Sequence, residues 1–297
     1  MLFTRHGIKA FLLLTFVFAL VGCSSNDQND DQKVLYIGGI PDQNLSVLEE
    51  RFGAVAEHLS EELGISVEYV PVTEYASLVT AFRNGDVHLA WFGGLTGLQA
   101  IAFTPGSKSI VQRPRDQEFT SVFIAHSSLE AESLGDLEGS TFTFGSINST
   151  SGHLMPRSFL LQAGIDPETN FSGVPNFSGS HDLTWKLVES GSFQAGALNS
   201  AVWERAVSQG SVDPESVRVI HETPSYVDYQ WVAHADIDEV FGEGSLDQVT
   251  DSILSIAGDT DRENRILELF GTESFVRVQP NSYDGLEEIA RSLDMLQ

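Results

Sequence analysis

Apolar runs alternate with amphipathic segments along the first third of this chain. Residues 34–40 form a continuous apolar run, which predicts a buried strand. Residues 46–63 carry apolar side chains at helical spacing and are followed by Gly64, which predicts an amphipathic helix that ends there. The order of strand and helix then repeats at 67–72, 75–84, 88–92 and 95–103. Strands that alternate with helices predict an α/β fold built on a parallel sheet.

Shorter elements follow toward the end of the chain. The pattern predicts strands at 119–125, 140–144, 194–198 and 217–220. It predicts helices at 133–137, 153–163 and 183–189, and from about residue 237 it predicts helical, acidic structure to the C-terminus. The sequence contains no internal repeat beyond the alternation of strands and helices.

A turn rich in hydroxyl groups joins the strand predicted at 140–144 to the next helix. Its residues are Ser149, Thr150, Ser151 and Gly152. The start of a helix exposes unpaired N–H groups and carries a partial positive charge, so a polar turn in this position can bind an anion. The alternative is an ordinary helix N-cap with additional serines.

Further candidate side chains lie at the carboxyl ends of predicted strands, where ligands bind in parallel α/β sheets. These candidates are Tyr75, Trp91, Phe92, Gly93 and, in the second half of the chain, Asn199. The alternative is that the aromatic side chains belong to the core and that Tyr75 caps a helix at the surface. The position that they share favours a ligand cleft.

The N-terminus has the features of a bacterial lipoprotein signal. Arg5 and Lys9 precede an apolar run at 10–21 that is too short to span a bilayer as a permanent helix. Small residues then precede Cys23, which resembles a lipobox and implies cleavage before this cysteine and lipid on its sulfur. The alternative is a plain signal peptide. We expect a signal peptide at 1–22, a tether at 23–33 and an extracytoplasmic protein anchored to a membrane.

The chain is strongly acidic. The full sequence has 16 lysines and arginines against 42 aspartates and glutamates, a formal net charge of −26. Removal of the predicted leader, which holds two of the basic residues, leaves 275 residues with a charge of −28. This length suits two domains, and the charge argues against nucleic acid as a partner. The single cysteine excludes an intrachain disulfide.

Sequence motifs of common catalytic and metal sites are absent. The eight histidines form neither a His-Glu-x-x-His motif nor a close pair, which argues against a zinc site. There is no Gly-x-Ser-x-Gly nucleophile motif and no glycine-rich loop for a nucleotide phosphate. We therefore expect a binding protein without metal or cofactor. The alternative is a secreted hydrolase that acts on a phosphate or sulfate ester.

The chain resembles the substrate-binding proteins of ABC importers for phosphate, phosphite and phosphonate, over nearly all of its mature length. The most specific match is residues 142–156. Shorter matches lie at 74–76, 90–93, 179–181 and 226–228. The sequence of residues 91–97 and 177–182 is closest to the branch described as selenate transporters.

The resemblance implies a two-lobed α/β protein with the type II periplasmic-binding-protein fold and a ligand cleft between the lobes. Lobe 1 would comprise residues 34–119 and 223–297, and lobe 2 residues 120–222. The implied partners are a small oxyanion and an ABC permease in the membrane, and we expect a monomer without enzymatic activity. Ser149, Thr150 and Ser151 would hold the oxyanion, with Tyr75 and His181 as further contacts.

Two positions depart from the family pattern. Phe92 stands where a tyrosine is usual, which removes a hydroxyl donor. The acid that binds the aminoalkyl group in aminoethylphosphonate binders is replaced near Ala201, which favours a small tetrahedral oxyanion instead. Because the chain is so acidic, we expect neutral hydroxyls and helix N-termini, without arginine, to bind this ligand.

Asp228 matches a ligand position of the family, and its charge bears on the identity of the ligand. An ionised aspartate only accepts hydrogen bonds, and so do sulfate and selenate near neutral pH. Phosphate, phosphite or phosphonate can keep a proton and donate it to Asp228. The alternative is that Asp228 turns away from the cleft, or caps the backbone of Tyr229 and Gln230.

Overall fold

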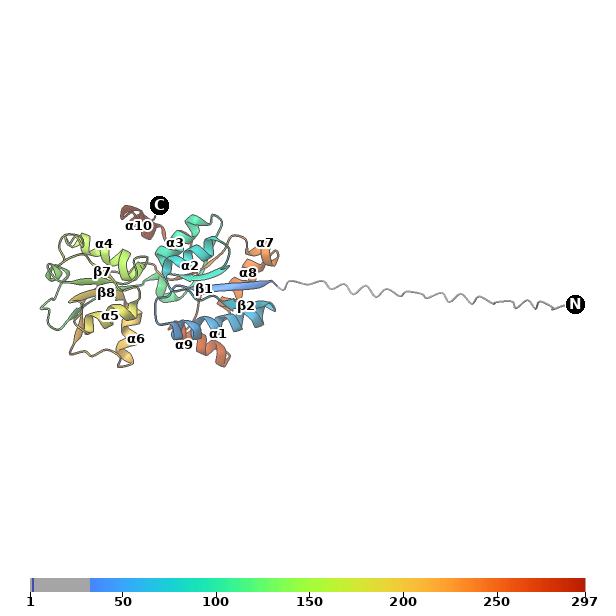
Figure 1. Ribbon diagram of the computed structural model, residues 1–297, viewed down its shortest axis with the longest axis horizontal. Helices are drawn as coiled ribbons and strands as arrows, with labels where there is room; N and C mark the ends of the chain where they lie inside the picture. The colour runs from blue at the N-terminus through green and yellow to red at the C-terminus, as the bar shows by residue number, and fades with distance from the viewer. Residues whose placement is uncertain (1, 3–32, 297) are drawn as a thin grey trace. The chain divides into compact units, whose positions relative to one another are not determined.

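Two β-sheets, each covered by helices, organise the part of the chain that the structure describes (Figure 1). The computed structural model describes residue 2 and residues 33–296. The chain divides into an N-terminal segment, 1–31, and a folded unit, 32–297. Apart from residue 2 and residue 33, the predicted signal peptide and tether, with Cys23, lie outside the described residues.

The first sheet has six strands in the order β11-β4-β10-β3-β1-β2. Its strands are β1 Val34–Gly39, β2 Ser66–Tyr69, β3 Leu89–Phe92, β4 Lys108–Gln112, β10 Gln230–Ala233 and β11 Val276–Arg277. The accompanying helices are α1 Leu45–Leu63, α2 Tyr75–Arg83, α3 Gly94–Phe103, α7 Ile237–Phe241, α8 Ser245–Leu254, α9 Asp261–Phe270 and α10 Asp284–Ser292. Figure 1 shows α2 and α3 on one face and α1 and α9 on the other. We call this sheet with its helices lobe 1.

The second sheet has five strands in the order β7-β6-β8-β5-β9. Its strands are β5 Ser121–His126, β6 Phe142–Phe144, β7 Asn176–Phe177, β8 Ala195–Asn199 and β9 Val217–Glu222. Its helices are α4 Met155–Gln162, α5 His181–Glu189 and α6 Ser200–Ser208, with a short 3-10 helix at Leu134–Leu137. Figure 1 shows α4 on one face and α5 and α6 on the other. We call this part lobe 2.

Local sequence explains why the long helix α1 begins and ends where it does. The side chain of Asn44 accepts a hydrogen bond from the Val47 N–H at 3.2 Å and so caps the first turn. Gly64 ends the helix in the left-handed conformation, with φ at 67°, which glycine adopts without steric cost. The apolar face of α1 is buried against the sheet, as the helical spacing of its residues predicts.

The prediction of a parallel sheet is correct only in part. In lobe 1, β1 pairs in parallel with β2 and β3, but β10 is antiparallel to β3 and β4. In lobe 2, β5 is antiparallel to both β8 and β9. The antiparallel strands β4, β5, β9 and β10 flank the two passages of the chain between the lobes. A strand that enters a sheet from the other lobe needs no crossover helix and can run against its neighbours.

The prediction of helical structure from residue 237 to the C-terminus is wrong at β11, which pairs with β4. A two-residue strand is too short to show a hydrophobic period. The sequence pattern likewise does not predict the strands β4, β7 and β10 as separate elements. The helix predicted at 153–163 begins earlier, because a π-helical turn at Thr150–Leu154 precedes α4.

Each lobe has its own apolar core. In lobe 1, Phe52 of α1 packs edge-to-face against Trp231 and Phe270. Burial of one such side chain stabilises the fold by roughly 1.5–3 kcal/mol. Lobe 2 has two clusters formed by alternate residues of its strands, which point to opposite faces of the sheet. A further cluster joins Leu95 of α3, Leu154 of the π-helical turn and Leu286 of α10, so the lobes share apolar contacts.

The chain passes between the lobes twice, and the two passages lie side by side. Phe119 and Tyr226 form an isolated antiparallel bridge, and the Asp228 N–H donates to the Asp116 carbonyl at 2.9 Å. The side chain of Thr223 accepts from the Ser121 N–H at 2.9 Å. This pairing places Asp228, at the end of the second passage, next to the junction of the lobes. Within the described residues, no helix has the length and apolar character needed to cross a bilayer.

Candidate functional site

The starts of α3, of α5 and of the π-helical turn at Thr150–Leu154 meet where the lobes face each other. The Leu95 N–H in the first turn of α3 donates to the hydroxyl of Thr150 in lobe 2 at 2.9 Å. The His181 N–H at the start of α5 donates to the Asp42 carbonyl in lobe 1 at 3.1 Å. Helix N-termini that converge in this way combine unpaired N–H groups with partial positive charge. The arrangement is suited to an anion.

The hydroxyl-rich turn forms the lobe 2 side of this site. Ser149, Thr150 and Ser151 are all buried, and the Ser149 side chain accepts from the Gly152 N–H at 2.9 Å. Single π-helical turns of the kind found here are frequent at functional sites. The sequence left open whether the turn is a cap or an anion site. Ser149 is a cap, and the first N–H groups of the turn have no acceptor within their own helix.

Gly152 is required by the close packing behind this turn. A Cβ atom at this position would lie 3.0 Å from the His181 ring and 3.1 Å from the Cα of Gly145. The His181 ring therefore lies directly against the turn. The candidates Ser149, Thr150, Ser151 and His181, which are separated in sequence, are brought together by this contact.

His181 is positioned as a neutral hydrogen-bond donor. Its side chain is fully buried, and its Nδ1 accepts from the Asn199 N–H at 3.3 Å, which assigns the ring proton to Nε2. Burial lowers the pKa of His181, with Asp42 acting in the opposite direction. Among the described residues, Nε2 has no hydrogen-bond partner. A buried donor without a partner is costly, so it points to a ligand.

Tyr75 supplies a second donor from the start of α2. Its side chain is buried, and its hydroxyl has no partner in hydrogen-bonding geometry within the described part of the chain. Burial first and Asp42 second raise the pKa of Tyr75 well above its usual value, with Ser149 opposing the shift. The hydroxyl therefore stays protonated, close to Ser149, and can donate.

Asp228 faces the same place with one free oxygen. Its Oδ1 accepts from the Gly94 N–H at 2.9 Å, whereas its Oδ2 is buried without a partner among the residues described. Burial raises the pKa of Asp228 to about 7, against the hydrogen bond from Gly94. The carboxylate does not cap Tyr229 or Gln230, which was one alternative. Near neutral pH this group can therefore either accept or donate a proton.

Asn199 joins the lobes through a chain of side-chain hydrogen bonds. Its Nδ2 donates to the Tyr229 hydroxyl at 2.9 Å, and that hydroxyl donates to Asp42 Oδ2 at 3.0 Å. The Asn199 Oδ1 accepts from the Val202 N–H at the start of α6. Both ends of its amide are thus engaged within the protein, and contact of Asn199 with a ligand stays a prediction.

Sequence reasoning did not select Asp42 and Tyr229. Asp42 follows strand β1 at its carboxyl end, the same kind of position that identified the other candidates, so that signal was available. Tyr229 lies in the second passage between the lobes, where no periodic pattern marks it. Both side chains are buried at the back of the site.

Trp91 and Phe92 are core aromatics, as their alternative interpretation held. Trp91 stacks on Tyr229 with ring centroids 5.6 Å apart, and Phe92 packs edge-to-face against Phe82 at 5.5 Å. Trp91 thereby supports Tyr229, which together with Asp42 forms what we call the back wall of the site. A direct contact of either ring with the ligand stays a prediction.

Gly93 allows the backbone of lobe 1 to approach the turn of lobe 2. A Cβ atom here would lie 3.1 Å from the Thr150 hydroxyl and 3.2 Å from Asp228 Oδ1. We expect Gly93→Ala to weaken anion binding at least several-fold, because the added methyl group obstructs closure. Isothermal titration calorimetry measures the effect. Gly53→Ala is the control, since a Cβ at that helical position meets nothing within 4 Å; equal affinities in both variants would contradict the prediction.

Arginines lie closer to the site than the sequence suggested. Arg51, Arg113 and Arg205 line a hollow of about 340 Å³ that also includes Asp42 and Tyr229. These guanidinium groups lie behind Asp42 and Tyr229, and the expectation that neutral hydroxyls and helix N-termini, without arginine, bind the ligand stays a prediction. Over the described residues, no group of three or more potential ligand side chains could hold a metal ion.

The comparison with known proteins decides the family. Residues 37–283 match the family model described as ABC transporter, phosphonate, periplasmic substrate-binding protein. The chain belongs to this family. The resemblance to the substrate-binding proteins of phosphate, phosphite and phosphonate importers is thereby confirmed, and so is the two-lobed type II periplasmic-binding-protein fold. The likeness to the selenate branch stays a prediction.

Similarities to individual proteins agree with this family assignment. The chain is 42% identical over 297 residues to the ABC transporter phosphite-binding protein PhnD1 of Prochlorococcus marinus (strain MIT 9301), covering 98% of this chain and 99% of that one. A structure of PhnD1 from that organism in complex with methylphosphonate has a TM-score of 0.87, at 43% identity, covering 89% and 100% of the two chains. A binding-protein component of a phosphonate ABC transporter from Pseudomonas aeruginosa shares the fold, with a TM-score of 0.76 at 19% identity over 87% and 86%. None of these relatives supports the ester hydrolase alternative.

Proposed function

We propose that this protein captures a small tetrahedral oxyanion of the phosphite and methylphosphonate class between its lobes and delivers it to an ABC permease. The observation that carries the proposal is a set of buried polar groups at the junction of the lobes that have no partner among the residues the structure describes. His181 Nε2 and the Tyr75 hydroxyl are donors there, and Asp228 Oδ2 is an acceptor or donor. The names of the similar proteins support the same class of ligand.

Asp228 favours a ligand that keeps a proton. A phosphite or phosphonate monoanion can donate its P–OH to the carboxylate and accept from the hydroxyls and N–H groups around it. Sulfate and selenate offer acceptors only, so Asp228 itself would have to keep the proton for them to bind beside it, whereas a phosphite or phosphonate monoanion brings its own. We therefore propose phosphite or a phosphonate as the ligand in preference to selenate, although the sequence of residues 91–97 resembles the branch described as selenate transporters.

The direct ligand contacts in this proposal are the turn and its opposing side chains. They are Tyr75, Gly93, Ser149, Thr150, Ser151, His181 and Asp228, with Trp91, Phe92 and Asn199 in the surrounding wall. The lobe boundaries we propose are residues 34–119 with 223–297, and 120–222. The membership of the strands in the two sheets supports these boundaries.

A panel of oxyanions tests the function. Residues 33–297, titrated with phosphite, methylphosphonate, phosphate, sulfate and selenate, should bind phosphite or methylphosphonate most tightly. A ligand at 100 times its Kd should stabilise the protein by roughly 2.7 kcal/mol in a thermal-shift assay. A preference for sulfate or selenate would overturn the ligand class, and hydrolysis of a model phosphate ester would restore the enzyme alternative.

The anchor is tested separately. We propose that Cys23 carries lipid and holds the protein at the outer face of a membrane, since a lone cysteine follows the apolar leader. Cys23→Ser should abolish lipidation and move the protein from the detergent phase to the aqueous phase in Triton X-114 partitioning. Ser24→Ala is the matched control and should not change partitioning. A Cys23→Ser protein that still enters the detergent phase would contradict the proposal.

A further inference from the structure

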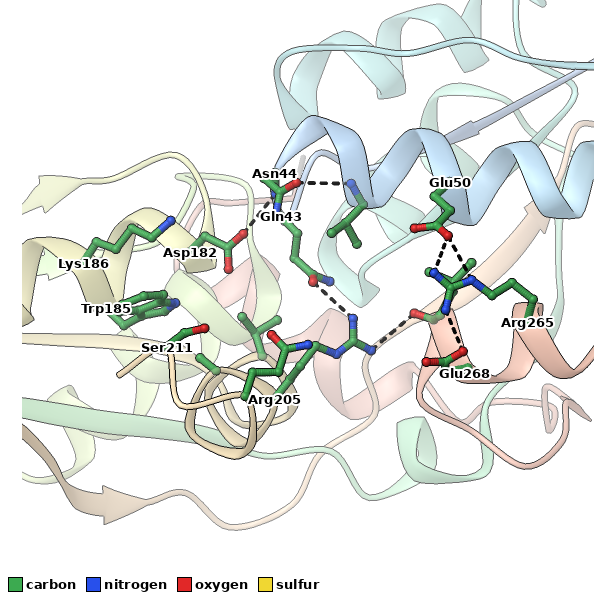
Figure 2. A pocket seen from close by; sticks show the side chains of 15 residues that line it. Gln43, Asn44, Glu50, Asp182, Trp185, Lys186, Arg205, Ser211, Arg265 and Glu268 are labelled. Atoms are coloured by element: carbon green, nitrogen blue, oxygen red, sulfur yellow. Dashed lines mark hydrogen bonds and ion pairs between the residues drawn. The ribbon is translucent and has the colours of Figure 1, made fainter. Parts of the chain in front are cut away.

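Arg205 of lobe 2 reaches across the junction to lobe 1. It lies in α6, is half-buried, and its Nη1 lies 3.4 Å from the Gln43 Oε1. Its Nη2 donates to the Leu269 carbonyl at 3.3 Å. Figure 2 looks into a neighbouring pocket, which Gln43, Asp182 and Arg205 help to line, and shows this side chain extending from the lobe 2 side toward Gln43 and α9. No carboxylate of the described residues lies within ion-pair distance of it, so its charge is not neutralised by a partner.

The place that Arg205 reaches is the C-terminus of α9. The Leu269 carbonyl also accepts from Arg51 Nε at 3.2 Å, and the Phe270 carbonyl accepts from Arg113 Nη1 at 2.8 Å. The C-terminal end of a helix carries partial negative charge and attracts cations. Two of the three guanidinium groups belong to lobe 1 and are present whether the lobes are open or closed. Arg205 belongs to lobe 2, so its guanidinium group reaches the α9 C-terminus only when the lobes close.

The buried carboxylate of Asp42 is the reason why positive charge is needed near the α9 C-terminus. Its carboxylate is buried at the back of the site, where Oδ2 accepts from Tyr229. Its nearest cation is Arg51, with 3.7 Å between Arg51 Nη1 and Asp42 Oδ1. A buried carboxylate this close to His181 and Tyr75 repels any anion that binds to them, and the protein as a whole is strongly acidic. The repulsion is strongest once the lobes have closed and excluded water.

The charged groups of Asp42, Arg113 and Arg205 interact electrostatically at the back wall. Burial lowers the pKa of Arg205, which Asp42 opposes and Arg113 reinforces. Arg113 is neutralised locally, since it forms a two-point ion pair with Asp116. The exposed pair of Arg115 and Glu204 also bridges the lobes, but it brings a cation together with an anion and adds no net charge. Arg205 is therefore the residue through which closure adds positive charge.

We infer that Arg205 determines the affinity of this protein for its anion without touching it. As the lobes close, its guanidinium group docks on the α9 C-terminus and offsets the field of Asp42 at the moment when the anion is buried. The inference rests on the proposed function for the nature of the ligand. Because the effect is electrostatic and acts from behind the wall, it applies to every oxyanion that binds and grows with the charge of that anion.

The test compares three variants of the mature chain. Arg205→Gln removes the charge, Arg205→Lys keeps it, and Arg262→Gln removes an equal charge from a surface pair within lobe 1. Kd values for phosphite, methylphosphonate and sulfate come from calorimetry, and dissociation rates from stopped flow. We expect Arg205→Gln to weaken the binding of the monoanions phosphite and methylphosphonate about 10-fold, and that of the dianion sulfate at least as much, mainly through faster dissociation. Arg205→Lys should recover most of the loss, and Arg262→Gln should bind as the wild type does.

Three outcomes would overturn the inference. Unchanged affinities in Arg205→Gln would show that its charge is irrelevant. A loss confined to one anion would indicate a direct contact. Arg205→Lys as weak as Arg205→Gln would assign the effect to hydrogen-bond geometry and not to charge.

A measurement without ligand separates this inference from the proposed function. Spin labels at Glu62→Cys in lobe 1 and Ser192→Cys in lobe 2, in a Cys23→Ser background, report the distance between the lobes by double electron–electron resonance. Arg205→Gln should shift the distances toward the open state, with Arg262→Gln unchanged. Equal distance distributions in all variants would overturn the docking of Arg205, whereas a wild type that closes but binds no oxyanion would overturn only the proposed function.

Discussion

Replacement of Asp228 by Asn is expected to reverse the order in which this protein prefers its anions. The carboxylate Oδ2 is buried and unpartnered in the described structure, so a protonated phosphite or phosphonate can donate to it. An amide N–H in the same place repels that proton but donates to sulfate or selenate. A hydrogen bond to a charged group contributes roughly 1.5–3 kcal/mol, so phosphite binding should weaken about 10- to 100-fold. Sulfate and selenate should bind more tightly relative to phosphite.

The ratio of the phosphite and sulfate affinities, measured at one pH in wild type and Asp228→Asn, checks this expectation. Asp166→Asn serves as the control, because Asp166 lies in a surface loop of lobe 2 and its Oδ1 only accepts from the Glu168 N–H at 3.0 Å. A ratio that stays constant would show that Asp228 does not contact the ligand. A wild-type protein that already prefers selenate would show that Asp228 does not select for a ligand that keeps a proton.

The same residue gives the free protein a pH-dependent stability. Burial raises the pKa of Asp228 to about 7 from a usual value of 3.8. Below pH 4 the carboxyl is protonated in both the folded and the unfolded state. Between pH 4 and 7 the unfolded chain releases the proton while the folded one keeps it, so this contribution to stability falls as the pH rises. Asp228→Asn should therefore raise the Tm at pH 8 and leave it nearly unchanged at pH 4.

Thr150→Ala is expected to cause the other large loss of affinity, about 100-fold. The Thr150 hydroxyl accepts from the Leu95 N–H of the opposite lobe, and we expect it to donate its own proton to the bound anion. The substitution removes both interactions and leaves a buried N–H unpaired in the closed state, at a cost of roughly 1–3 kcal/mol. Calorimetric titration with phosphite measures the loss.

Thr150→Ser keeps the hydroxyl and is the matched control, with a change of only a few-fold. Ser149→Ala and Ser151→Ala should each weaken binding about 10- to 100-fold if the turn holds the anion. Ser149→Ala should also destabilise the free protein by about 1 kcal/mol, because Ser149 caps the turn. Unaltered phosphite affinity in all three alanine variants would leave only the cap as the role of this turn.

The tests at Thr150 and Asp228 also bear on how the lobes close. Leu95, Gly93 and Gly94 belong to the start of α3 in lobe 1, and each lies close to Thr150 or hydrogen-bonds to Thr150 or Asp228. A ligand bound between them completes contacts that the lobes already make. We therefore expect the variants to change dissociation more than association.

Much of the candidate site could be proposed from the sequence because its parts are local. Hydroxyls at a helix start and polar residues at a strand end follow from the backbone geometry of a few neighbouring residues. These signals identified the turn at Ser149, Thr150 and Ser151, and the position of Tyr75. The motif that carries the family resemblance covers the same turn, so the sequence also predicted the class of protein and its fold.

The sequence by itself determined the alternation of strands and helices in the first third of the chain, the acidic composition and the family. The tertiary structure decided which side chains meet across the cleft, such as Asn199 with Tyr229 and Arg205 with Gln43, which lie 162 residues apart. It also decided that β10 runs antiparallel in the first sheet. The periodicity of apolar residues indicates only whether a side chain faces a core, because it follows from the geometry of a single helix or strand. The partners of Asp42 and Arg205 depend on how the chain passes twice between the lobes, and no short stretch of sequence contains that information.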